Sequence, residues 1–312
     1  FCAGAGTLIF HACSKMQVPA FLGSSFAFLG GFHTIANLNS GIYAAMSVND
    51  KAAYACGGIV MAGALYLLLA ALVRTVGIAR VMRYLPPVVT GPMIVCIGLS
   101  LAGSAIGNAS QNWTLAARAL ASIVVFTIWG RGMLRIIPIL MGITVSYLAA
   151  SVLSACGAAN PDGSAIIDYA PIAQAAWFGL PDFQVCKFDV TSNLVMAPIA
   201  LASIMEHIGD MSAISATCGR NYLAEPGLHR TLLGDGLATM AAGFVGGPAN
   251  TTYGENTGVL VLSRVYDPRV VRIAAVLAIL LACVPKFSAV ISTLPASLIG
   301  GVSFILYGMI SA

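Results

Sequence analysis

Apolar runs near the length that crosses a lipid bilayer, about 20 residues, recur along most of the 312-residue chain. Charged residues make up only 8% of the sequence, whereas a soluble domain carries about 25%. So few charges cannot cover a surface that faces water. We therefore expect an all-α polytopic membrane protein, and this excludes a soluble enzyme, a nucleic-acid-binding protein and a disordered chain.

Charged or Gly- and Pro-rich breaks divide the apolar sequence into eleven predicted segments. They cover residues 1–14, 20–37, 52–73, 86–107, 114–130, 133–156, 192–213, 230–247, 250–264, 268–285 and 289–311. The chain opens on Phe1 and stops at Ala312, each inside an apolar run. We therefore expect it to be an internal part of a longer permease-like protein.

Lysine and arginine fall unevenly on the loops of these segments. If successive loops alternate sides, one side carries Lys15, Arg74, Arg80, Arg83, Arg131, Arg135, Arg220, Arg230, Arg264, Arg269 and Arg272. The other side carries only Lys51, Arg118, Lys187 and Lys286. Because cytoplasmic loops are enriched in basic residues, the first side is predicted to be cytoplasmic and the long connection over 157–191 external. The chain is thus expected to be a multi-pass protein of the plasma (cell inner) membrane.

Two segments, residues 19–28 and 248–256, are too short and polar for ordinary spanning helices. They resemble each other, because Ser24-Ser25-Phe26 in the first matches Thr251-Thr252-Tyr253 in the second. Interrupted segments at corresponding places in two halves indicate an inverted repeat with a binding site at mid-depth, where half-helix ends offer free N–H groups. The alternative is a pair of unrelated Gly/Pro kinks.

Four carboxylates, Glu206, Asp210, Asp235 and Glu255, lie in or beside apolar segments. Each costs about 2.5 to 3.5 kcal/mol at the centre of a membrane helix, so a functional reason is expected. Glu206 and Asp210 are four residues apart and share a helix face, where like charges repel. One of them should hold a proton near neutral pH, as a proton-coupled carrier requires. Asp210 could instead approach the cytoplasmic interface.

Structural roles are the alternatives for the other polar residues. Glu255 could form a capping box with Thr252, and Asp235 could pair with Arg230 near a helix start. We interpret His207 as structural, because it points away from the face of its neighbouring glutamate. The histidines show no metal-ligand spacing, and no nucleophile–base pair, HExxH motif or phosphate loop occurs. No metal, cofactor or enzymatic activity is therefore expected.

Several motifs together resemble the nucleobase–ascorbate transporter family, and within it most closely the bacterial uracil permeases. They are Pro19…Gly-Ser-Ser-Phe-Ala-Phe28, Glu206-His-Ile-Gly-Asp210, Pro226-Gly-Leu-His-Arg230, Gly234-Asp-Gly236, Gly247-Pro-Ala-Asn-Thr-Thr-Tyr-Gly-Glu-Asn-Thr-Gly258 and Gly300-Gly-Val-Ser-Phe-Ile-Leu-Tyr307. The resemblance covers nearly the whole chain.

The resemblance implies a fourteen-helix fold of two inverted seven-helix repeats, of which about eleven spans would be present here. It implies a core, substrate-binding domain over 1–83 and 192–285 and an incomplete gate domain over 84–191 and 286–312. It also implies a homodimer in lipid. The helix expected before residue 1 normally lines the site, so the chain alone should be incomplete for transport.

The resemblance also implies the site. Residues at the positions of Glu206 and Glu255 hydrogen-bond a nucleobase, and backbone amides at Phe26 and Gly254 meet its carbonyl oxygens. The aromatic rings of Phe26 and Tyr253 pack on the base. Uracil offers both N–H donors and C=O acceptors on one flat ring, which fits such a set.

Proton coupling in the family is linked to the positions of Glu206, Asp210, Ser303 and Tyr307, with the proton as the coupling ion. Uracil permeases often have His where this chain has Asp210, and Asp there is commoner in xanthine carriers. Glu255, where xanthine carriers tend to have Gln, favours uracil. The prediction is therefore uracil:proton symport by alternating access, with xanthine or another oxo-purine as the alternative. An anion carrier of the same architecture is more remote, because the acidic residues would repel an anion.

Overall fold

The computed structural model describes residues 1–84 and 87–311. The described part omits the side chains of residues 79, 82, 84, 87–91, 93, 94, 97, 100, 255, 262, 310 and 311. The chain forms two compact units, residues 1–94 with 181–283 and residues 95–180 with 284–312. Their roles as core and gate domains stay predictions.

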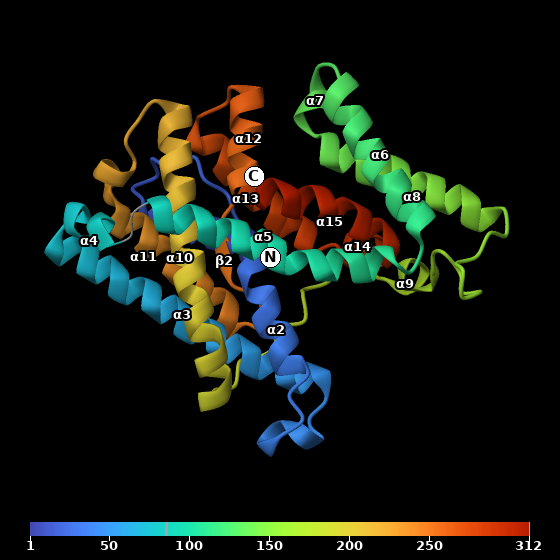
Figure 1. Ribbon diagram of the computed structural model, residues 1–312, viewed down its shortest axis with the longest axis horizontal. Helices are drawn as coiled ribbons and strands as arrows, with labels where there is room; N and C mark the ends of the chain where they lie inside the picture. The colour runs from blue at the N-terminus through green and yellow to red at the C-terminus, as the bar shows by residue number, and fades with distance from the viewer. Residues whose placement is uncertain (85–86, 312) are drawn as a thin grey trace. The chain divides into compact units, whose positions relative to one another are not determined.

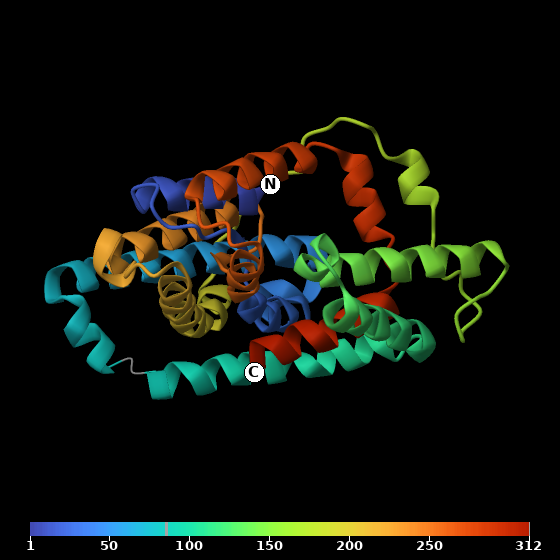
Figure 2. The ribbon, with the colours of Figure 1, turned by 90° about the horizontal axis from the view of Figure 1, so that it is seen from above.

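The first unit contains a bundle of helices around a short two-stranded sheet (Figure 1). Its elements are α1 (Cys2–Cys13), β1 (Leu22–Ser24), the 3-10 helix η1 (Phe26–Phe28), α2 (Leu29–Ala36), the 3-10 helix η2 (Gly41–Ala45), α3 (Val48–Val76), α4 (Ile78–Tyr84), α10 (Val190–Cys218), the π-helix η3 (Leu223–Gly227), α11 (Leu228–Phe244), β2 (Asn250–Thr252), α12 (Gly254–Ser263) and α13 (Pro268–Ala282). Helix α3 packs along α10 and α11, and α1 packs against α11 and α13 (Figure 2).

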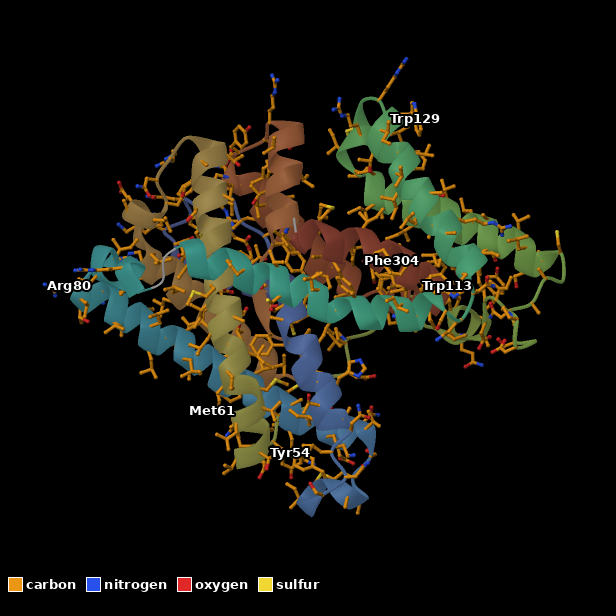
Figure 3. All side chains as sticks on the ribbon, viewed as in Figure 1. Tyr54, Met61, Arg80, Trp113, Trp129 and Phe304 are labelled. Carbon is orange, nitrogen blue, oxygen red and sulfur yellow. The ribbon has the colours of Figure 1, made fainter. Side chains whose placement is uncertain are left out.

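The second unit is helical, and α5 (Pro87–Ala109) leads into it from the first. It contains α6 (Trp113–Trp129), α7 (Met133–Ile136), α8 (Pro138–Ala155), α9 (Ala170–Gln174), α14 (Pro285–Ser292) and α15 (Ala296–Ser311). The end of α5 and α6 meet at 118°. Helix α6 packs between α8 and α15, and the rings of Trp113 and Phe304 stack with centroids 6.5 Å apart (Figure 3).

The predicted apolar segments correspond to helices, with several differences. Segments 20–37 and 250–264 each contain a strand followed by a helix. Segment 133–156 is divided into α7 and α8, and segment 289–311 is interrupted before Pro295, giving α14 and α15. Helices α3 and α10 are longer than predicted, because Ser47 and Asp189 cap them beyond the apolar run. Among the described residues, α3, α8 and α10 are each long and apolar enough to cross a membrane, and two bent helix pairs would raise this to five spans.

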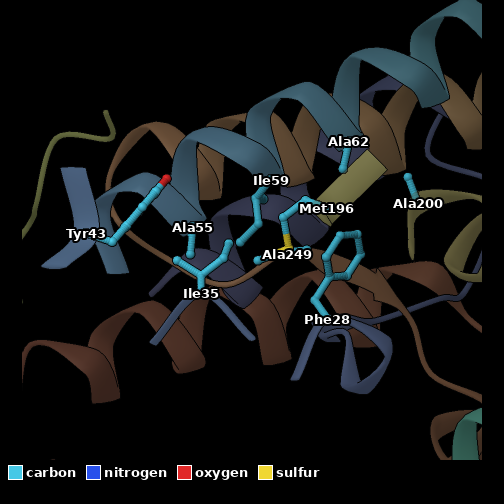
Figure 4. Packing of buried hydrophobic residues seen from close by; sticks show 9 residues of the cluster. All are labelled: Phe28, Ile35, Tyr43, Ala55, Ile59, Ala62, Met196, Ala200 and Ala249. Carbon is cyan, nitrogen blue, oxygen red and sulfur yellow. The ribbon is translucent and has the colours of Figure 1, made fainter. Parts of the chain in front are cut away.

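Small residues let the helices of the first unit approach closely. A Cβ on Gly63 of α3 would lie 2.8 Å from the carbonyl oxygen of Gly236 on α11. A Cβ on Gly58 would lie 2.8 Å from the carbonyl oxygen of Ser192 on α10. In lipid, helix association depends on such close packing, since burial of apolar surface gives little drive. One resulting core cluster contains Phe28, Ile35, Tyr43, Ala55, Ile59, Ala62, Met196, Ala200 and Ala249 (Figure 4).

Candidate functional site

The two interrupted segments meet in the first unit as an antiparallel pair. Strand β1 pairs with β2 in the register Leu22↔Thr252, Gly23↔Thr251 and Ser24↔Asn250. The amide of Ser25 continues the pairing by donating to the carbonyl oxygen of Ala249 at 2.8 Å. Non-helical backbone at membrane depth must find its hydrogen-bond partners within the protein, and here each segment supplies them to the other. The alternative of two unrelated kinks is therefore wrong.

Side chains from α1 and α11 complete the hydrogen bonding of this sheet. The Leu22 amide donates to Thr7 Oγ1 at 2.9 Å, and Thr239 Oγ1 donates to the carbonyl oxygen of Asn250 at 2.8 Å. Nε2 of His11 lies 3.0 Å from the carbonyl oxygen of Ala20. The side chains of Thr7, His11 and Thr239 are fully buried. The two strands are thus held in a fixed position between helices.

A helix begins directly after each strand. Residue Phe26 opens η1, which continues into α2, and Gly254 opens α12. Neither start has a side-chain cap among the described side chains. In transporters, helix starts of this kind direct backbone N–H groups toward the ligand. The rings of Phe26 and Tyr253 are parallel within 8°, with centroids 5.8 Å apart, and the Tyr253 hydroxyl donates to the carbonyl oxygen of Ser24. The structure therefore brings together Phe26, Tyr253 and Gly254.

The two carboxylates of α10, Glu206 and Asp210, are half-buried. Helix α10 packs against η1, β2 and α12. Asp210 Oδ2 accepts a hydrogen bond of 2.9 Å from Thr252 Oγ1. A Cβ on Gly254 would lie 3.1 Å from Asp210 Oδ1, so this carboxylate stands beside the start of α12. The structure therefore places Asp210 beside the second interrupted segment, and its approach to the cytoplasmic interface stays a prediction.

Asp235 lies in the middle of α11 rather than near a helix start, and its side chain is fully buried. Its Oδ2 is 2.9 Å from Nδ1 of the fully buried His207, so the alternative in which Asp235 pairs with Arg230 is wrong. The N–H alignment is poor, and neither Asp235 oxygen nor His207 Nε2 has a well-aligned hydrogen-bond partner among the described residues. His207 Nδ1 also lies 3.4 Å from Thr252 Oγ1. His207 therefore lies among buried polar groups, and its structural interpretation stays a prediction.

Glu255 lies in the first turn of α12, and its side chain is outside the described part of the structure. The alternative of a capping box with Thr252 is wrong, because Tyr253 is the N-cap residue of α12. The Thr252 hydroxyl instead donates to Asp210.

Ser303 and Tyr307 lie one turn apart on α15 of the second unit. Both side chains are buried. Their predicted role in proton coupling stays a prediction.

Two asparagines of the second interrupted segment were not predicted as positioning residues. Asn250 Nδ2 donates to the carbonyl oxygens of Cys2 at 3.1 Å and Ala238 at 3.3 Å. Asn256 Nδ2 donates to the carbonyl oxygen of Phe21 at 3.2 Å, which ties α12 to the first segment. Amide side chains inside a mid-membrane motif were the available signal. In the described ranges, no group of His, Cys, Asp and Glu could hold a metal ion.

Paired interrupted segments beside membrane-embedded carboxylates define a multi-pass membrane carrier. A model described as "Permease family" matches residues 1–312, and the chain belongs to this family. The uracil permease of Bacillus caldolyticus is 40% identical, with 99% of this chain and 70% of that protein covered. The uracil permease of Escherichia coli K12 is 36% identical, with 99% and 69% covered.

The transmembrane domain of a cyanobacterial bicarbonate transporter, BicA, has a similar fold, with a TM-score of 0.69 at 14% identity. The match covers all of this chain and 87% of that domain. The predicted all-α transporter fold is confirmed, and the protein is a multi-pass protein of the plasma membrane.

Proposed function

We propose that the protein imports uracil together with a proton, by alternating access. The observation that carries this proposal is the identity of 36–40% to proteins named uracil permeases over 99% of the chain. The paired segments support it, because two uncapped helix starts and half-buried carboxylates suit a flat ring with N–H donors and C=O acceptors.

Each contact of the base follows from this chemistry. The carboxylates of Glu206 and Glu255 accept the ring N–H groups, and the amides of Phe26 and Gly254 donate to the carbonyl oxygens. A base held between two rings needs their centroids about 7 to 8 Å apart, since contacting carbon atoms lie about 3.5 to 4.0 Å apart. The rings of Phe26 and Tyr253 are 5.8 Å apart, so they separate on binding or the base stacks on only one of them.

The proton is the coupling ion, and no other cofactor is needed. Glu206 and Asp210 share the substrate-facing side of α10, where binding of a proton by one relieves their repulsion. Ser303 and Tyr307 respond to this change from α15. The working protein is a homodimer in lipid, which cross-linking of the full-length protein in membranes would test.

Binding of radiolabelled uracil by the full-length protein tests the assignment. We expect Glu206→Gln and Glu255→Gln to lose binding by at least tenfold, because each amide presents an N–H donor where the base needs an acceptor. Glu225→Gln is the matched control, since Glu225 is exposed on η3 and should bind uracil as the native protein does. Failure of the native protein to bind any nucleobase would refute the proposal.

Asp210 is the one observation that favours xanthine or another oxo-purine as the second candidate. Competition of uracil against xanthine, guanine and ascorbate in proteoliposomes, with and without a pH gradient, decides between them. Displacement of labelled uracil by xanthine at lower concentration than by uracil itself would reverse the assignment. Recovery of unchanged uracil from the vesicles would agree with transport without catalysis.

A further inference from the structure

Four polar side chains form a continuous chain through the first unit. Asp235 Oδ2 on α11 lies 2.9 Å from His207 Nδ1 on α10. The same nitrogen lies 3.4 Å from Thr252 Oγ1 on β2, and that hydroxyl donates to Asp210 Oδ2 at 2.9 Å. Asp235, His207 and Thr252 are fully buried, whereas Asp210 is half-buried beside the start of α12. This series of side chains thus links the buried Asp235 to Asp210, the carboxylate next to the proposed substrate site.

Among the described side chains, Tyr66 and Glu206 are ionisable groups near these four residues. Tyr66 from α3 and Phe10 from α1 meet the His207 ring edge-on, with ring centroids 6.5 and 6.2 Å away. The Tyr66 hydroxyl donates to Ser203 Oγ at 2.9 Å, which keeps it away from His207. On α10, Glu206 directly precedes His207 and Asp210 lies three residues after it, and Asp235 faces the imidazole from α11. Burial of an acid and an imidazole in such surroundings costs free energy of folding, so we expect this pair to have a function.

The number of available hydrogens decides which group donates and which accepts along this series of four side chains. The Thr252 hydroxyl has one hydrogen, which it donates to Asp210. Its contact with His207 therefore requires an N–H at Nδ1, which also faces Asp235. Hydrogen bonds that run in one direction strengthen one another. With its N–H directed at Thr252 Oγ1, and with the Asp235 carboxylate 2.9 Å from the same nitrogen, His207 makes Thr252 a better donor to Asp210 in its ionised form.

We propose that His207, which lies beside the buried Asp235, is a positioning residue that acts through Thr252 on proton uptake by Asp210. This inference rests on the proposed proton-coupled function and adds to it a control element outside the substrate contacts. The one bond formed is the O–H bond on Asp210, whose proton comes from water on one side of the membrane and leaves on the other. His207 and Asp235 exchange no proton in the cycle and orient Thr252 throughout.

The test is the pH dependence of uracil uptake by the full-length protein in proteoliposomes. We expect His207→Leu to move the profile by about one pH unit toward higher pH, because the ionised form of Asp210 loses support and takes up a proton more easily. His207→Asn should stay near the native profile, since its amide nitrogen can replace the Nδ1–H donor. Thr252→Val should shift the profile like His207→Leu, while Thr252→Ser should not.

Matched controls separate this role from a merely structural one. His11→Leu removes another fully buried histidine, and Thr239→Val another fully buried hydroxyl that bonds β2. Both should lower the yield of folded protein without moving the profile. The double variant of His207→Leu with Thr252→Val should shift no further than either single variant, since both break one chain.

A native pH profile in correctly folded His207→Leu would overturn the inference, as would equal shifts for His207→Leu and His207→Asn. If His207→Leu does not fold, the pair Thr252→Val and Thr252→Ser decides, and identical profiles for the two overturn it. Uracil uptake by the native protein that ignores pH would refute the proton coupling itself. A pH-dependent native protein with unshifted variants would refute only the role of His207.

Discussion

At the scale of single residues, two glycines explain how a carboxylate is buried in this bundle. Asp235 stands between Gly234 and Gly236 on α11. A Cβ on Gly234 would lie 2.9 Å from Cα of Phe10, and one on Gly236 would lie 2.7 Å from Cβ of Tyr66. Helices α1 and α3 therefore approach α11 on both sides of the acid. The Gly-Asp-Gly motif thus encodes close packing as well as a charge.

The packing predicts the effect of Gly236→Ala. The added methyl group has no room, so we expect a loss of about 1 to 3 kcal/mol, typical of overpacking. Gly103→Ala on α5 is the control, because nothing lies within 4 Å of its Cβ position and alanine favours a helix. Thermal unfolding of both variants in detergent checks this. An unchanged melting temperature in Gly236→Ala would contradict the packing.

At the scale of elements, the start of α10 is joined to the segment before α3. Asp189 caps α10 by accepting from the Thr191 amide at 2.9 Å, and its Oδ2 accepts from the Tyr43 hydroxyl at 3.0 Å. Burial raises the pKa of Asp189, but the hydrogen bonds from Tyr43 and Thr191 outweigh it and leave that pKa lowered. Burial and the bond to Asp189 raise the pKa of Tyr43 to about 12, so it remains a donor at neutral pH.

The lowered pKa of Asp189 predicts acid sensitivity. The contribution of ionised Asp189 to stability is complete above the pKa of an aspartate in the unfolded chain, about 3.9. This contribution is lost as the pH falls through the lower pKa that Asp189 has in the folded protein. Asp189→Asn still caps α10 but does not titrate. We expect its melting temperature to fall less than that of the native protein between pH 5 and pH 3. Glu225→Gln, which removes an exposed carboxylate on η3, is the control and should follow the native protein.

The support of β1 by α1 gives a second prediction at this scale. Thr7→Val keeps the shape of the side chain but removes the acceptor for the buried Leu22 amide. An unsatisfied buried donor costs about 1 to 3 kcal/mol, so we expect a lower melting temperature and weaker uracil binding. Thr75→Val is the control, since the Thr75 hydroxyl is exposed and bonds only within α3. Equal stability of the two variants would contradict the role of Thr7.

At the scale of the whole molecule, the distribution of basic residues predicts the orientation of the protein. Exposed Cys156 follows α8 at the start of the connection predicted to be external. Cys218 ends α10 on the predicted cytoplasmic side. Both thiols are free. They therefore report the two sides of the membrane.

A membrane-impermeant maleimide added to intact cells should label Cys156 at least tenfold more than Cys218. We expect this because loops rich in Lys and Arg stay in the cytoplasm. Mass spectrometry of variants that keep only one of the two cysteines measures the labelling. Opening the cells by detergent is the control and should expose Cys218. Preferential labelling of Cys218 in intact cells would reverse the orientation.

The apolar runs predicted the positions of the helices, because crossing lipid requires long stretches without charge. The matching of Ser24-Ser25-Phe26 with Thr251-Thr252-Tyr253 predicted that the interrupted segments belong together. It did not predict that they form strands, because strands of three residues need partners far along the chain. The polar neighbours of His207 were missed for a related reason. Its neighbours Asp235 and Thr252 come from other elements, and helix periodicity describes only its own helix.

The amino-acid sequence by itself determined the class of protein and the helical segments, because lipid penalises every exposed charge and every unpaired backbone group. Only the tertiary structure decided which polar groups meet. Asp235 pairs with His207 rather than Arg230, and Thr252 serves Asp210 rather than a helix cap. These choices depend on how closely α1, α3, α10 and α11 approach, which glycines and side-chain shapes set in three dimensions.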